Sequence, residues 1–265
     1  MSDYVAKPSL ALRNSSRGVE KFDVLIVGGT WNPNGDGVTE TFATALDSGR
    51  FAHRMIPYPA DYGTRVSYGQ STAVGRSALI GAIESASNRV VLAGYSQGAA
   101  IAGDVAAEIG RGELAHLEVV ACALIADPLR PSGCCLGPDP GGYGIAGQRH
   151  IPNIPTYWVG AQGDPITALP AGNPLRSVAD LSVYFGLSSP QAALEWGQSL
   201  IEVAARRRWQ RWWSTSNRSS WAGALAYARG YLFDGRHTDD YVRLGHAVRL
   251  AEAINAMVIA SAGSR

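Results

Sequence analysis

Hydrophobic runs alternate with segments of helical spacing along the first part of the chain. Short apolar runs predict strands at residues 22–27, 51–58, 89–93, 119–126 and 156–160. Between them, apolar residues spaced three or four apart predict helices at residues 39–46, 71–86 and 97–109. Strands that alternate with helices are typical of a mostly parallel sheet covered on both faces, which places the chain in the α/β class. In such sheets the chemistry lies at the carboxyl ends of the strands.

The alternation stops at residue 190, where a block without strands begins. Residues 190–231 carry only helical patterns, which predicts a helical subdomain inserted at residues 181–231. The core is then expected at 22–180 and 232–265, preceded by an N-terminal extension at 1–21. A long helix is expected at residues 240–260, and its buried side is expected to carry Leu244, Ala247, Ala251, Ile254 and Val258.

Composition excludes several classes of function. Apolar residues make up 46% of the 265 residues and charged residues 17%, which is unlike a disordered chain. The formal net charge of +1 gives no basis for nucleic-acid binding. No apolar run approaches the length of a membrane span, and the N-terminus does not resemble a secretory signal.

The three cysteines suit neither a disulfide framework nor a metal site. Their number is odd, and Cys134 and Cys135 are adjacent. We therefore expect a chain that is made and folded in a reducing cytosol, with Cys122 as part of the hydrophobic core.

A serine between two glycines follows the third predicted strand. The sequence Gly94-Tyr95-Ser96-Gln97-Gly98 also opens a predicted helix, the context in which G-x-S-x-G forms a nucleophile elbow. The alternative is a plain strand-turn-helix connection in which Ser96 only caps the helix. The elbow is the favoured interpretation.

A serine nucleophile needs a histidine and a carboxylate, which in this topology follow it in the order acid, then histidine. His237, in a loop before the last helix, is preferred to His246, which we expect on a solvated face of that helix. Asp164 is preferred as the acid to Asp127, because it follows the later strand. In the alternative interpretation, His237 is a surface histidine and the Gly163-Asp164-Pro165 segment is only a turn.

Negative charge on a reacting carbonyl oxygen needs hydrogen-bond donors. The backbone N–H of Gln97 and a donor from the loop after the first strand, Thr30, are the candidates for this oxyanion hole. The alternative for Thr30 is a glycine-rich turn without a catalytic role. Its neighbour Trp31 is a candidate for substrate contact.

These residues together resemble the cutinase-like serine esterases of the α/β-hydrolase fold, and within them the mycobacteriophage lysin B family. The resemblance rests on GYSQGA, IADPLR, GDP and HTDDY, and extends over about residues 22–260. The absence of a signal peptide favours lysin B. So does Asn88-Arg89, where secreted cutinases have a cysteine. The predicted helical block between Asp164 and His237 also favours lysin B.

The resemblance implies a function in phage-induced lysis of a mycobacterial host. The reaction would be hydrolysis of the ester between mycolic acids and arabinogalactan, through Ser96, His237 and Asp164, without metal or cofactor. A related lipid ester is a further candidate substrate, and a monomer is expected. The protein would be made in the host cytoplasm and would act on the cell envelope after release.

Tryptophans and arginines lie side by side in the predicted insertion, in the segment RRRWQRWW. Trp209, Trp212 and Trp213 could contact lipid or an acyl chain, but an aromatic stripe of this kind more often packs within its own domain. The competing functions are a general cutinase or lipase acting on polyesters or triglycerides, and a non-catalytic module that binds the cell wall.

Overall fold

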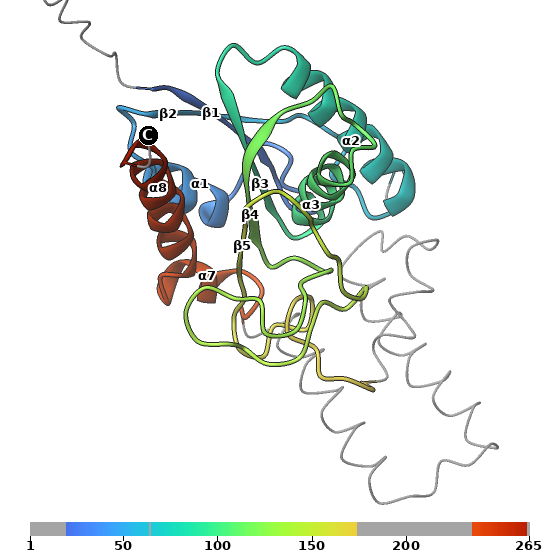
Figure 1. Cartoon of the computed structure of the whole chain (residues 1–265). Coiled ribbons are helices and arrows are strands. Elements are labelled where there is room, and N and C mark those ends of the chain that lie inside the picture. Colours follow the sequence, from blue (N-terminus) through green and yellow to red (C-terminus); the bar gives the residue numbers. More distant parts are fainter. Residues whose placement is uncertain (1–19, 64, 174–234, 264–265) are drawn as a thin grey trace, which may run out of the picture.

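Five parallel strands form the central sheet of the computed structural model, which describes residues 20–63, 65–173 and 235–263. The strand order is β2-β1-β3-β4-β5, and the four neighbouring pairs are all parallel (Figure 1). The strands are β1 (Phe22–Val27), β2 (Phe51–Met55), β3 (Arg89–Tyr95), β4 (Val119–Ile125) and β5 (Thr156–Val159). The predicted α/β class is confirmed.

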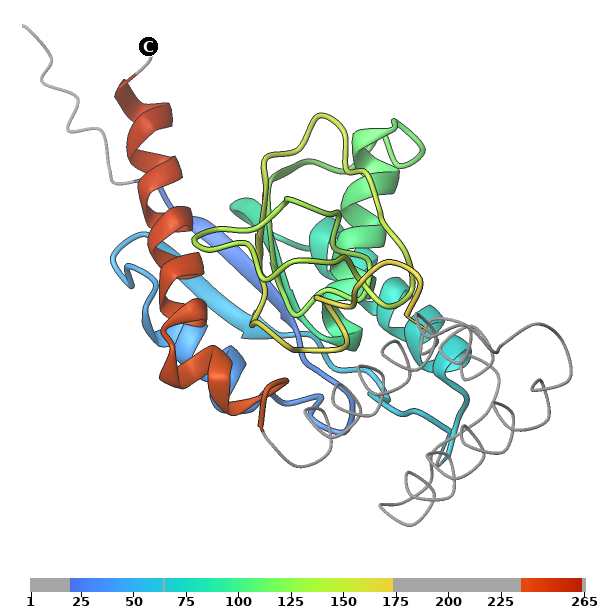
Figure 2. The ribbon, with the colours of Figure 1, turned by 90° about the horizontal axis from the view of Figure 1, so that it is seen from below.

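Helices cover both faces of this sheet. α2 and α3 lie on one face, and α1 and α8 lie on the other (Figures 1 and 2). The helices are α1 (Gly37–Thr44), α2 (Tyr68–Glu84), α3 (Gln97–Gly110), α7 (Asp239–Arg243) and α8 (His246–Gly263). α1 and α2 begin with capping boxes at Asp36 and Ser67, whose side chains accept hydrogen bonds from otherwise unpaired N–H groups of the first turn.

The alternation of side chains along β3 explains the two hydrophobic cores. Val91, Ala93 and Tyr95 face the core shared with α1 and α8, whereas Val90 and Leu92 face the core shared with α2 and α3. Because both faces are covered, the strand reads as a continuous apolar run. Cys122 belongs to the second core and is fully buried, as expected, and burial raises the pKa of its thiol.

Two element boundaries differ from the sequence-based expectation. β2 ends at Met55 rather than at residue 58, because Pro57 and Pro59 carry no N–H to continue the ladder. β3 extends to Tyr95, directly before Ser96, and not to residue 93. Ser96 therefore follows the last residue of β3 directly, with no loop between them.

The expected single C-terminal helix is wrong. α7 and α8 are separated at Leu244-Gly245, and Gly245 has φ +72°, a left-handed conformation that ends a helix. Leu244 is 51% exposed and not buried, while Ala247, Ala251 and Ile254 are buried as expected. The side chain of Val258 and the predicted insertion at 181–231 lie outside the described residues, so the domain boundaries stay a prediction.

No helix in the described parts of the chain combines the length and apolar character needed to cross a lipid bilayer.

Candidate active site

Ser96 lies at a sharp turn between β3 and α3. Its backbone has φ 55° and ψ −117°, outside the regions that a serine usually adopts, and its N–H donates to the Ile125 carbonyl at 3.0 Å. The side chain makes no capping hydrogen bond to α3. The interpretation of Ser96 as a simple helix cap is therefore wrong, and the hydroxyl is presented for another purpose.

The two glycines around Ser96 are required by close packing. A Cβ on Gly98 would lie 2.1 Å from the Val27 carbonyl oxygen, and one on Gly94 would lie 2.3 Å from the Gly98 carbonyl oxygen. No rearrangement of a side chain could relieve either contact, since both involve backbone atoms. The glycines thus let the start of α3 approach the end of β1.

His237 joins Ser96 to Asp164. Its Nε2 lies 2.9 Å from Ser96 Oγ, and its Nδ1 lies 3.1 and 3.0 Å from the two carboxylate oxygens of Asp164. Asp164 is fully buried and His237 nearly so. A carboxylate only accepts hydrogen bonds, so Nδ1 carries the proton and Nε2 presents its lone pair to the Ser96 hydroxyl. The structure thus brings together the three residues that the sequence singled out.

Two tyrosine hydroxyls support this chain of contacts, and the sequence analysis missed both. Tyr241 donates to Asp164 Oδ2 at 2.6 Å, and Tyr95 donates to the His237 carbonyl oxygen at 2.6 Å. The ring of Tyr95 also stacks on the imidazole. The sequence gives a partial indication that both tyrosines lie near the site, since Tyr95 precedes the serine and Tyr241 ends the HTDDY segment.

His246 is not a second candidate base. It is the first residue of α8 and is 9% exposed, so the expectation of a solvated face was wrong. Its ring packs against Tyr241, and its Nδ1 lies 3.3 Å from the Arg249 guanidinium. Burial, and then the charge of Arg249, lower its pKa.

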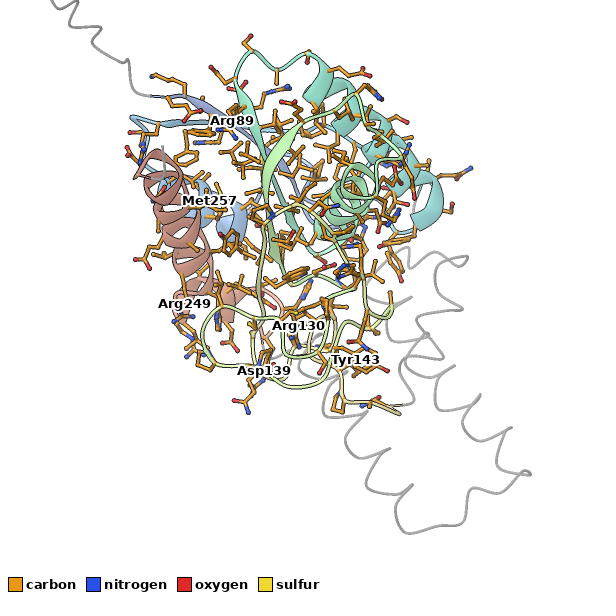
Figure 3. The ribbon with its side chains drawn as sticks, in the orientation of Figure 1. Arg89, Arg130, Asp139, Tyr143, Arg249 and Met257 are labelled. Carbon is orange, nitrogen blue, oxygen red and sulfur yellow. The ribbon has the colours of Figure 1, made fainter. Side chains whose placement is uncertain are left out.

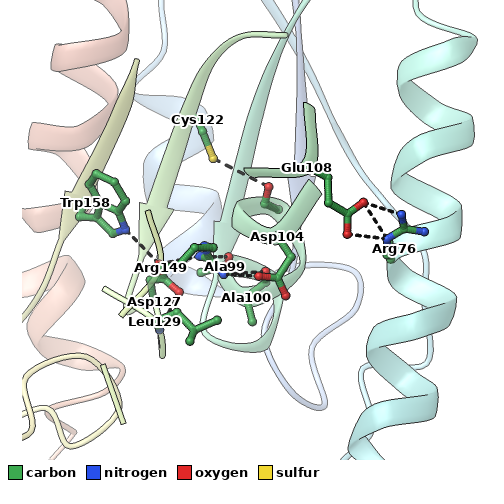
Figure 4. Close-up of polar contacts among 11 residues, drawn as sticks. Arg76, Ala99, Ala100, Asp104, Glu108, Cys122, Asp127, Leu129, Arg149 and Trp158 are labelled. Atoms are coloured by element: carbon green, nitrogen blue, oxygen red, sulfur yellow. Dashed lines mark hydrogen bonds and ion pairs between the residues drawn. The ribbon is translucent and has the colours of Figure 1, made fainter. Parts of the chain in front are cut away.

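Asp127 has a structural role beneath the nucleophile turn. Its carboxylate accepts hydrogen bonds from Arg149 Nη2 at 2.7 Å and from Trp158 Nε1 at 2.9 Å (Figure 4). Arg149 also reaches Asp104, and it donates to the Ala99 and Ala100 carbonyls in the first turn of α3. The carboxylate of Asp127 thus ties α3 to β4 and β5.

We expect Gly103→Ala to destabilise the protein by about 1–3 kcal/mol, the usual range for overpacking. A Cβ on Gly103 would lie 1.9 Å from Arg149 Nη2 and would push this guanidinium out of its place. Urea denaturation measures the effect. Gly81→Ala in α2 is the matched control, because its Cβ would meet only open space, and we expect it to stabilise slightly. Equal stability changes in the two variants would contradict the packing argument.

The loop after β1 lies against the serine. A Cβ on Gly29 would lie 3.6 Å from the Ser96 Cβ, so the backbone just before Thr30 passes close to the serine. Trp31 follows with φ 64° and a 56% exposed side chain, and its N–H donates to the Ala60 carbonyl at 2.6 Å. This short bond holds the loop in its strained conformation.

Gln97 starts α3, and its side chain is held away from the solvent. The amide nitrogen donates to the Asp61 carbonyl at 3.1 Å, and the amide oxygen lies 3.2 Å from the Tyr58 hydroxyl, which also donates to the Gly28 carbonyl at 2.7 Å. Burial raises the pKa of Tyr58, which keeps this hydroxyl protonated as a donor. Because the side chain is held in these contacts, the backbone N–H is the group of Gln97 that can donate to a substrate oxygen.

A buried arginine braces the loop that carries the acid. Arg130 is fully buried near Asp139 (Figure 3), and its guanidinium donates to five backbone carbonyls, among them Thr167 at 2.9 Å and Gly141 at 2.7 Å. Thr167 lies three residues after Asp164. Arg130 thereby fixes the loop that follows β5 against the loop that follows β4.

Some expectations fall outside these residues or stay open. Trp209, Trp212 and Trp213 lie outside the described part of the chain. Among the described residues, no group of three His, Cys, Asp or Glu side chains is placed to hold a metal ion, and all three cysteines are unpaired. The absence of a cofactor stays a prediction.

Comparison with known proteins identifies the fold. The PE-PPE domain family matches residues 52–159, less than half of the chain, and comparison with curated sequences gives no significant match. Lysin B from Mycobacteriophage D29 is 18% identical, with 87% of this chain and 99% of that chain covered and a TM-score of 0.54. A cutinase-like protein from Cryptococcus sp. is 21% identical (64% and 98% covered, TM-score 0.45), and an acetylxylan esterase is 20% identical (71% and 98%, 0.42).

The chain has an α/β-hydrolase fold. The match to lysin B shows the fold, and the parallel sheet with helices on both faces agrees with it. The serine after β3, the buried carboxylate after β5 and the imidazole before α7 lie in hydrogen-bond contact. Such an arrangement can draw a proton from a serine hydroxyl and hold the resulting imidazolium against a carboxylate.

Proposed function

We propose that this chain is a carboxylic ester hydrolase in which Ser96 is the nucleophile, His237 the general base and Asp164 the acid that orients the base. The observation that carries the proposal is the 2.9 Å contact between Ser96 Oγ and His237 Nε2, continued by Nδ1 to Asp164. A serine that only stabilised the turn would not need this partner. The strained backbone at Ser96 aims its hydroxyl at the imidazole.

The reaction follows from this geometry. Ser96 Oγ attacks the ester carbonyl while its proton passes to His237 Nε2, and Asp164 stabilises the imidazolium. The backbone N–H groups of Gln97 and Thr30 receive the negative charge on the carbonyl oxygen. His237 then returns the proton to the departing alkoxide. Water, deprotonated by the same imidazole, releases the acid from Ser96.

A fluorophosphonate probe tests this first level of the proposal. It should form a covalent bond at Ser96, located by mass spectrometry of the labelled peptide, and the labelled protein should no longer hydrolyse p-nitrophenyl esters. A protein that binds cell-wall polymer without labelling and without hydrolysis would instead be a non-catalytic binding module.

The natural substrate we propose is the ester that joins mycolic acids to arabinogalactan in the mycobacterial cell wall. This finer assignment rests on the motifs GYSQGA, IADPLR, GDP and HTDDY and on their resemblance to the lysin B family. The protein would act on the envelope of the host after its release during phage lysis. Trp31, which is exposed in the loop after β1, offers an apolar surface for a long acyl chain.

Purified mycobacterial cell wall distinguishes this substrate from the alternative. Release of free mycolic acid, detected by thin-layer chromatography and mass spectrometry, is the expected result. Hydrolysis of triglycerides or polyesters with no release of mycolic acid would assign the chain to the general cutinase or lipase class. The triad proposal would survive that outcome.

A further inference from the structure

Tyr241 is the residue that completes the surroundings of the triad carboxylate. Asp164 Oδ1 accepts from the Ile166 N–H at 2.9 Å, and Oδ2 accepts from the Tyr241 hydroxyl at 2.6 Å. Both oxygens also face the imidazole. Tyr241 comes from α7, only four residues after His237, and is fully buried.

We propose that Tyr241 is a positioning residue of the triad, which fixes the orientation of the Asp164 carboxylate through its hydroxyl. This inference rests on the proposed ester hydrolase function. Without this donor, Oδ2 would keep only the imidazole as a partner among the contacts described, and the carboxylate could rotate about its Cβ–Cγ bond. The distance to Nδ1 would then vary.

The direction of the Tyr241 hydrogen bond is set by the carboxylate, which only accepts. The phenolic proton therefore points to Asp164, and the phenolic oxygen also accepts from the Ala161 N–H at 3.1 Å. Burial, and then the charge of Asp164, raise the pKa of Tyr241 well above its usual value, which keeps the proton on the hydroxyl. The ring is fixed between Tyr95 and His246, with centroid distances of 6.3 and 5.7 Å.

Charged groups around the triad are held by partners of their own. Arg236 donates to the Gln162 carbonyl at 3.2 Å, Arg243 pairs with Asp240 at 2.8 Å, and Arg249 contacts His246. Asp239 lies beside Gly235, and its side chain contacts the Thr238 hydroxyl. Removing the Tyr241 hydroxyl leaves all of these groups in place, so a change in pH dependence would report on Asp164 and His237.

We expect Tyr241→Phe to lower kcat by about 10- to 100-fold, the range for losing one hydrogen bond to a charged group. The acidic limb of the pH profile of kcat/KM should also move to higher pH. Asp164 without its donor attracts the imidazolium proton more strongly, so His237 stays protonated, and therefore inactive as a base, up to a higher pH. A loss of stability alone would lower the number of active molecules but would not move this limb.

Tyr157→Phe is the matched control. Tyr157 lies on β5 and packs against the same core, so this variant also removes one tyrosine hydroxyl from that side of the sheet. Active-site titration with the fluorophosphonate counts the competent sites in each variant, so kcat refers to folded enzyme. An unchanged pH profile in Tyr241→Phe, with a kcat equal to that of Tyr157→Phe, would overturn the proposal.

A double-mutant cycle with Asp164→Asn separates a role through the carboxylate from a role elsewhere. Because Tyr241 acts through Asp164, adding Tyr241→Phe to Asp164→Asn should cost little further activity. Full additivity of the two losses would overturn the positioning role. Failure of the wild-type enzyme to label at Ser96 would instead reject the proposed function itself, so the two failures are distinguishable.

Discussion

Replacing Ser96 by alanine is expected to lower kcat for p-nitrophenyl esters by about 10⁶-fold and to abolish fluorophosphonate labelling. His237 Nε2, the proposed base, lies 2.9 Å from this hydroxyl. Residual turnover would come from substrate binding and the oxyanion donors alone. Steady-state kinetics and mass spectrometry of the labelled protein measure both effects.

The same variant should remain folded. The Ser96 side chain makes no capping bond, and alanine meets the same backbone strain at φ 55° as serine does. Ser77→Ala, which removes a hydroxyl from the exposed face of α2, is the control for the substitution itself. If Ser96→Ala kept more than a hundredth of the wild-type kcat, the nucleophile would have to be sought elsewhere.

The fold was predictable because its main signals are local. A parallel strand buried on both faces must be apolar along its buried length, which is what residues 24–27 and 119–125 show. The break between α7 and α8 was missed for the opposite reason. Apolar spacing continues across Gly245, and only the left-handed backbone of that glycine ends the helix.

The triad residues were predictable because each role demands one residue type in a fixed chain order. The elbow glycines, Asp164 after β5 and His237 before α7 satisfy that order. The contacts made by their polar partners were not predictable. Whether a tyrosine such as Tyr241 donates to a carboxylate 77 residues away, or whether Arg149 reaches Asp127, depends on long-range geometry that no local pattern records.

Asp127 and Asp164 allow a direct comparison between an aspartate with a structural role and an aspartate proposed to act in catalysis. Both are fully buried aspartates that follow neighbouring strands, and each accepts hydrogen bonds from two side chains. Asp164→Asn should lower kcat by about 10⁴-fold, because an amide donor next to Nδ1 favours the wrong imidazole tautomer. Kinetics per titrated site measures this loss.

Asp127→Asn should act on stability instead. Its loss leaves the buried Arg149 guanidinium with Asp104, whose side chain is 53% exposed, as its remaining carboxylate partner. Removing one partner of a buried ion pair costs about 3–5 kcal/mol, and the contact with Asp104 places this case at the lower end. Urea denaturation should therefore show a large loss for Asp127→Asn with kcat per site nearly unchanged. The reverse pattern would mean that Asp127 is the acid of the triad, which the 3.0 Å contact between His237 and Asp164 argues against.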